Sequence, residues 1–166
     1  MTEHDYNHLL LNWLKSAYAM ENSLVNMLDN QAERASIFPE VATRLREHRK
    51  ESQRHANMVE GCIKRLGGDV SQVRKGMSKL MGELQSKFLD AYQDTIVRDA
   101  IVGAASEQFE IASYKAIIAL AEKLGDQKTV SVCEEILAEE EDMYHFLNDH
   151  LHDLVGESYE RDVLTT

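Results

Sequence analysis

Proline and glycine are scarce in this chain, which has one proline and eight glycines among 166 residues. Both residues commonly occur at turns, so their scarcity indicates few turns and predicts long helices. The apolar fraction of 43% and the charged fraction of 28% are those of a globular protein. A chain of this length is most simply one domain, and we expect residues 1–166 to form it.

Several other features are absent from the sequence. It contains no run of ~18 apolar residues, so we expect no membrane-spanning helix. Its first residues, Met1 to Asp5, lack the basic and apolar regions of a signal peptide, which favours a cytoplasmic location. The two cysteines, Cys62 and Cys133, form no CxxC pair, and the simplest expectation is two buried reduced thiols.

Positive charge is also in short supply. The formal net charge is −11, with 18 basic and 29 acidic residues. Proteins that bind nucleic acid neutralise phosphates with clustered Lys and Arg, so this balance argues against such a partner. We interpret one short basic cluster, Arg74, Lys75 and Lys79, as solvated surface.

The spacing of apolar residues predicts four long helices, at about residues 5–33, 39–66, 94–124 and 126–154. Pro39 suits the first turn of the second helix, Gly67 and Gly125 suit helix ends, and Asp126 is a good N-cap. Residues 69–93 are predicted to be a crossover containing a short helix, and residues 155–166 a loose tail. The predicted fold class is therefore all-α, a four-helix bundle with a long crossover between its second and third helices.

Each predicted long helix carries a glutamate on or near its apolar stripe. These glutamates are Glu21, Glu51, Glu107 and Glu140. A carboxylate inside a bundle is costly unless a proton, an Arg or Lys partner, or a metal neutralises it. One such residue per helix suggests carboxylates that converge on a dinuclear metal site.

Further donors accompany these glutamates. Glu110 lies one turn beyond Glu107, and the second helix places His48 and His55 within the same sector as Glu51. Ferritin-like dinuclear proteins use a single Glu from two helices and Glu-x-x-His from two others. The predicted metal ligands are Glu21, His48, Glu51, His55, Glu107, Glu110 and Glu140. Such donors suit iron or manganese, with zinc possible.

Two alternatives stay open. The fourth helix has Met143 where the second Glu-x-x-His needs histidine, which predicts an incomplete second ion position. The glutamates can also be ordinary interface residues paired with Arg44, Arg54 or Lys115, without any metal. Three tyrosines are candidates to hydrogen-bond the ligating carboxylates or to be plain core residues, namely Tyr18, Tyr114 and Tyr144.

Several motifs resemble the YciE/YciF-like proteins, a ferritin-superfamily family of stress proteins. They are Trp13-Leu14-x-x-Ala17-x-Ala19-Met20-Glu21, His48-x-x-Glu51-Ser52, Glu107-Gln108-Phe109-Glu110-Ile111-Ala112-Ser113-Tyr114 and Leu137-Ala138-Glu139-Glu140-x-x-Met143. The resemblance extends from about Tyr6 to Leu154 and is closer to the YciE branch. It implies a ferritin-like four-helix bundle, a homodimer and a bacterial cytoplasm under stress. Glu107-x-x-Glu110 also resembles the paired carboxylates of rubrerythrins, which bind two irons and reduce peroxide.

Two functions follow from these observations. In the first, a dinuclear iron or manganese site handles iron or reacts with a small oxidant such as peroxide or dioxygen. In the second, the protein is a non-enzymatic dimeric scaffold that uses its surface without metal. A DNA-protecting iron cage is disfavoured because the chain has no basic tails.

Overall fold

The computed structural model describes residues 2–71 and 95–164. Its described elements are α1 (Glu3–Arg34), a short 3-10 helix η1 (Ala35–Ile37), α2 (Pro39–Arg65), α4 (Thr95–Lys123) and α5 (Gln127–Leu164). The four predicted long helices are present. The predicted short helix of the crossover, with Arg74, Lys75 and Lys79, lies outside the described residues.

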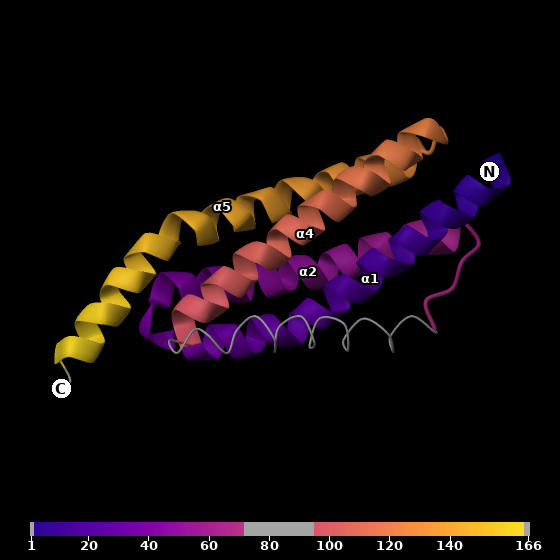
Figure 1. Ribbon diagram of the computed structural model, residues 1–166. Coiled ribbons are helices and arrows are strands. Elements are labelled where there is room, and N and C mark those ends of the chain that lie inside the picture. Colours follow the sequence, from indigo (N-terminus) through magenta and orange to yellow (C-terminus); the bar gives the residue numbers. More distant parts are fainter. Residues whose placement is uncertain (1, 72–94, 165–166) are drawn as a thin grey trace.

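The helices form two hairpins (Figure 1). In one, α1 and α2 are antiparallel neighbours joined through η1, and in the other a three-residue turn joins α4 to α5. The hairpins pack across each other, and the N-terminus and the end of α5 lie at opposite ends of the molecule (Figure 1). This is the predicted all-α bundle of four long helices, and most of the predicted crossover between the second and third of them lies outside the described residues.

The turns follow the local signals in the sequence. Gly67 (φ 76°) and Gly125 (φ 71°) adopt the left-handed conformation that favours glycine at a helix end. After Gly125, Asp126 caps α5, where its side chain accepts a hydrogen bond from the backbone N–H of Thr129. Pro39 occupies the first turn of α2. These short-range signals position the helix ends correctly to within a few residues.

The prediction for the end of the fourth long helix, α5, was wrong. The helix runs to Leu164 instead of stopping at about residue 154, so residues 155–164 of the predicted loose tail are helical. Leu154 and Ser158, one turn apart, are buried, and Leu154 lies beside Gln31 and Ala35 at the end of the first hairpin. The helix continues past Gly156, a residue that weakens helices, and Ser158 beyond it is buried.

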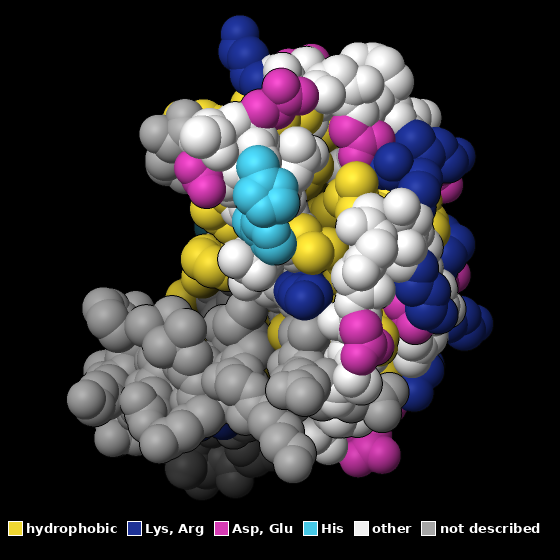
Figure 2. All heavy atoms as spheres, turned by 90° about the vertical axis from the view of Figure 1, so that its right-hand side faces the viewer, with side chains coloured by type: hydrophobic (Ala, Val, Ile, Leu, Met, Phe, Trp, Pro, Cys, Tyr) yellow, Lys and Arg dark blue, Asp and Glu magenta, His cyan; other side chains and the backbone are white. Residues whose placement is uncertain are grey.

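The core runs along the inside of both hairpins. The predicted apolar stripe of α1 is buried throughout, from Leu10 and Leu14 to Leu28, and Glu21 lies among these residues at 0% exposure. On the outside, acidic and basic side chains lie side by side, as the end-on view in Figure 2 shows for the end that carries the Arg65–Asp126 ion pair. Within the described residues, no helix combines the length and apolarity needed to cross a membrane.

Candidate metal centre

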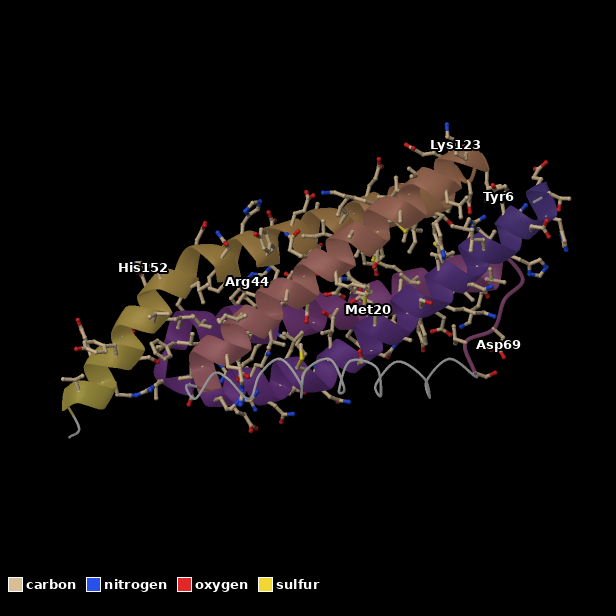
Figure 3. The ribbon with its side chains drawn as sticks, in the orientation of Figure 1. Tyr6, Met20, Arg44, Asp69, Lys123 and His152 are labelled. Atoms are coloured by element: carbon tan, nitrogen blue, oxygen red, sulfur yellow. The ribbon has the colours of Figure 1, made fainter. Side chains whose placement is uncertain are left out.

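Six buried side chains from all four long helices meet inside the bundle. They fall into two groups, His48 with Glu107, Glu110 and Glu140, and Glu21 with His55 and Glu140. In each group the donor atoms lie within 4.8 Å of one another, and Glu140 belongs to both. Met20, labelled in Figure 3, directly precedes Glu21 and marks the level of the cluster along α1. Six of the seven predicted ligands are therefore brought together.

Helix geometry explains how each element contributes. His48 and His55 are seven residues apart, or two turns, so both point from the same face of α2. This spacing gives each group one imidazole. Glu107 and Glu110 are three residues apart on α4 and reach the same group. The cluster is therefore built from ordinary helical spacing.

The imidazoles approach the carboxylates with one nitrogen each. His48 Nε2 lies 3.3 Å from Glu107 Oε1 and 3.5 Å from Glu140 Oε2. On the other side of the shared carboxylate, His55 Nδ1 lies 2.8 Å from Glu140 Oε1 and 3.6 Å from Glu21 Oε1. Glu140 thus faces one imidazole with each of its oxygens.

Within the described residues, many atoms that face the centre of the cluster have no well-formed hydrogen bond, although His55 Nδ1 lies only 2.8 Å from Glu140 Oε1. Both oxygens of Glu110 and of Glu140 are buried and unpartnered, as are the inward nitrogens of His48 and His55. One oxygen of Glu21 and one oxygen of Glu107 are also buried and unpartnered. Buried polar atoms are nearly always satisfied, so these donors require protons or cations among them. An all-oxygen-and-nitrogen donor set of this kind fits two divalent ions.

Glu51 lies outside both groups. Its Oε2 is 2.9 Å from His48 Nδ1 and accepts a hydrogen bond of 2.8 Å from the Arg44 guanidinium. Burial raises the pKa of Glu51, but the hydrogen bonds from His48 and Arg44 prevail and lower it to about 2. The alternative of pairing with Arg44 therefore holds for this residue. Its carboxylate fixes the ring proton on His48 Nδ1 and leaves Nε2 free to bind an ion.

A second carboxylate plays the same role for the other imidazole. Glu139 Oε2 lies 2.7 Å from His55 Nε2, and Arg54 forms an ion pair with Glu139. Sequence reasoning did not identify Glu139. The sequence did contain a signal. Arg54 precedes the predicted ligand His55 on one helix, and the acidic Glu139 precedes the predicted ligand Glu140 on another, so the two neighbouring residues have opposite charges and can pair.

Tyr114 is the tyrosine that joins the cluster. Its side chain is fully buried, and its hydroxyl donates a 2.5 Å hydrogen bond to Glu21 Oε1. Burial and the negative charge of Glu21 raise the pKa of Tyr114 well above its ordinary value. The phenol therefore stays protonated and orients the carboxylate, which is one of the two alternatives left open for the candidate tyrosines.

A family comparison places this geometry in context. The family described as "Domain of unknown function (DUF892)" matches residues 5–160. The chain belongs to this family. The resemblance to YciE/YciF-like proteins is thereby confirmed.

Solved structures agree on the fold. A protein from Xanthomonas campestris is 30% identical, with a TM-score of 0.82, and the match covers 95% of this chain and 98% of that one. The Escherichia coli stress protein YciF is 22% identical, with a TM-score of 0.76 and coverage of 94% and 98%. A bacterioferritin from Desulfovibrio desulfuricans, described with a diiron site, is 21% identical, with a TM-score of 0.74 and coverage of 98% and 91%. The last two similarities show a shared ferritin-like fold.

Burial sets the protonation of the acids in the cluster. Burial, together with the charges of neighbouring carboxylates and first of all Glu140, raises the pKa of Glu110 well above its ordinary value. For Glu140, burial outweighs the opposing contacts with His55 and His48 and raises the pKa to about 7. Without metal, burial therefore favours the protonated form of Glu110 over its carboxylate.

The pKa values of the two imidazoles are raised as well. For His48, burial favours the neutral ring, but the charge of Glu107 and hydrogen bonds to carboxylates prevail and raise the pKa to about 10. For His55, burial is again outweighed, chiefly by Glu140, and the pKa rises to about 10. The metal-free cluster therefore holds protons in the places that cations would take.

We expect pH to act oppositely on the metal-free fold and on metal binding. Groups with a raised folded-state pKa stabilise the fold below their unfolded pKa and lose that contribution as pH rises through the folded value. For Glu140 this window extends from 4.5 to about 7, and for His48 and His55 from 6.5 to about 10. Urea unfolding of chelator-treated protein should therefore show falling stability from pH 5 to 9. Uptake of Mn(II) at pH 7, followed with an indicator dye, should release a proton from each imidazole, and uptake without proton release would contradict this assignment.

Proposed function

We propose that this protein holds a dinuclear iron or manganese centre inside its helical bundle and uses it to handle iron or a small oxidant such as peroxide. One observation supports this most strongly. Six buried side chains form two groups that share Glu140. Most of the oxygens and nitrogens that they point into the cluster have no hydrogen-bond partner among the described residues. Zinc fits the same donor types.

The two groups define which residues would hold each ion. His48 Nε2, Glu107 and Glu110 would bind one ion, Glu21 and His55 Nδ1 the other, and Glu140 would bridge them. When bound, such ions supply Lewis-acid and redox chemistry toward peroxide or dioxygen. Four carboxylates and two neutral imidazoles carry the charge that balances two divalent cations.

The rest of the site belongs to the protein. Glu51 and Glu139 hold the outward nitrogens of the imidazoles, and Tyr114 holds Glu21. The six donors are at most 2% exposed, so bulk water is kept away from them. Ligands fixed in this way need little rearrangement when ions bind, which favours tight and geometrically selective binding.

The comparisons support the biological setting that we propose. The Desulfovibrio bacterioferritin was described with a diiron site, and YciF was described as a stress protein. We propose a bacterial stress response as the setting of this chain and the cytoplasm as its location.

Direct metal analysis tests the proposal. Protein purified without chelator, or reconstituted anaerobically with Fe(II) or Mn(II), is expected to contain about two ions per chain, one for each donor group. Iron, manganese and zinc are measured together by mass spectrometry of the digested protein. A chain that carries no metal and takes up none from Fe(II) or Mn(II) would contradict the metal function.

A second candidate function, a dimeric scaffold without metal, rests on the end of α5. Val155, Tyr159 and Val163 lie four residues apart and are 47%, 68% and 53% exposed. This spacing places them on one side of the helix, as an apolar strip that a second copy can cover. We propose a homodimer for either function, and light scattering on the purified protein measures its mass.

A further inference from the structure

Ser52 is a buried polar residue beside the metal cluster with no assigned role. It lies four residues after His48 and three before His55, so all three side chains share one face of α2. All three are 0% exposed. Because the two imidazoles belong to different donor groups, Ser52 lies on the helix face between the two proposed ion positions.

In the part of the chain that the structure describes, the hydroxyl of Ser52 has no hydrogen-bond partner. Several helical serines of this chain donate to a backbone carbonyl one turn earlier, as Ser16 does to Asn12 at 3.1 Å and Ser113 does to Phe109 at 2.7 Å. Ser158, far from the cluster near the end of α5, shares the unpartnered state. Ser52 does not take this ordinary route. A buried hydroxyl left unpaired costs free energy, so its position calls for an acceptor that binds there.

The motif pattern indicates what Ser52 replaces. Ferritin-like dinuclear sites carry Glu-x-x-His on two helices. On α5 the chain keeps the acid and replaces the histidine, as Glu140-x-x-Met143, and on α2 it keeps the histidine and replaces the acid, as Ser52-x-x-His55. On the face of α2 between His48 and His55, the chain therefore has a short hydroxyl where the motif has a carboxylate.

We propose that this position binds a small anion of one to three heavy atoms between the two ions, and that the Ser52 hydroxyl donates a hydrogen bond to it. The proposal rests on the dinuclear centre proposed above. The chemistry is that of a bridging anion that takes the place of the absent carboxylate. Four glutamates already balance two divalent ions, so the anion adds most when the ions carry more charge, as after oxidation.

Azide binding to the iron-loaded protein tests this role. Azide is titrated into oxidised, iron-loaded protein, and its dissociation constant is read from the absorption band that azide forms with Fe(III). The Ser52→Ala variant is expected to bind azide about tenfold more weakly, since a hydrogen bond to a charged acceptor is lost. Ser52→Thr keeps the hydroxyl and should stay within about threefold of wild type. Ser52→Glu restores the carboxylate and should retain iron while losing the azide band.

Metal content and a control variant separate the possible failures. Ser113→Ala removes a helical serine whose hydroxyl is already bonded to Phe109, and it should leave azide affinity unchanged. Wild-type protein that binds no iron would overturn the dinuclear centre and this inference together. Two bound irons with no azide binding, or with equal azide affinity in wild type and Ser52→Ala, would overturn the role of Ser52 and leave the centre standing. Azide binding that survives in iron-loaded Ser52→Glu would do the same.

Discussion

Replacing Glu140 by glutamine is expected to reduce the metal content from about two ions per chain to less than one. Glu140 is the member common to both donor groups, and each of its oxygens faces a different imidazole. Glutamine keeps the size of the side chain but removes the charge and one acceptor oxygen. Loss of an outer partner of a metal ligand already costs 10–100-fold in affinity, so loss of a shared ligand should cost about 100-fold or more. Metal analysis after dialysis against metal-free buffer measures the effect.

The neighbouring residue provides a matched control. Glu141 is on the same helix but forms a 2.7 Å ion pair with Lys115, and both side chains are substantially exposed. Glu141→Gln should keep the wild-type metal content, because it lies outside the donor groups. Helical circular dichroism of both variants shows whether the bundle is intact. A folded Glu140→Gln protein that retains two ions would rule out a shared bridging role for Glu140.

Metal binding is expected to raise the midpoint of thermal unfolding by about 10 °C. The donors are held together only in the folded chain, so a cation binds the native state and shifts the equilibrium toward it. At a free ion concentration about a thousand times the dissociation constant, the gain is ~4 kcal/mol. For a chain of this size, ~1 kcal/mol corresponds to a shift of roughly 2–4 °C. The measurement is calorimetry of chelator-treated protein with and without Mn(II).

Two comparisons make this result specific. Mg(II) prefers a coordination shell rich in water and oxygen, so it should shift the midpoint much less than Mn(II) at the same concentration. Glu140→Gln should show little response to Mn(II), while Glu141→Gln should respond like wild type. An unchanged midpoint in wild type would favour the metal-free scaffold over the dinuclear centre.

Most of the fold followed from local signals. The predicted ends at Gly67, Gly125 and Asp126 correspond to observed turns, since glycine at positive φ and an aspartate cap act over a few residues. The end of α5 could not be predicted from such signals. Residues 155–164 lack a strong stop or start signal, and the burial of Leu154 and Ser158 depends on the position of the first hairpin.

The candidate site was only partly predictable. Helical periodicity was enough to place Glu21, Glu107 and Glu140 inside, because a residue's phase on a helix is a local property. Glu51 was predicted as a ligand because it is near the same face, yet its carboxylate reaches Arg44 and the outer nitrogen of His48. Glu139 shows the converse, since its role depends on which residues of α2 lie opposite α5.

The same distinction applies to the missing histidine. The sequence indicated that the fourth long helix lacks a second imidazole at Met143 and predicted an incomplete ion position. The structure gives each donor group one imidazole, because α2 contributes both. Counting motifs helix by helix could not reveal this, because the packing of the four helices decides which carboxylates each imidazole meets. His48 faces carboxylates of α4 and α5, and His55 faces carboxylates of α1 and α5.

By itself, the sequence determined the four long helices, their turns and the acids on their inner faces, because helix phase and turn chemistry act over a few residues. Only the tertiary structure decided that Glu140 is shared, that Glu139 holds the outer nitrogen of His55, and that Tyr114 binds Glu21. The hydrogen bond from Tyr114 to Glu21 alone joins residues 93 positions apart. Distances between helices fix such contacts, and these distances are set by how two hairpins pack around a core that also holds buried charge.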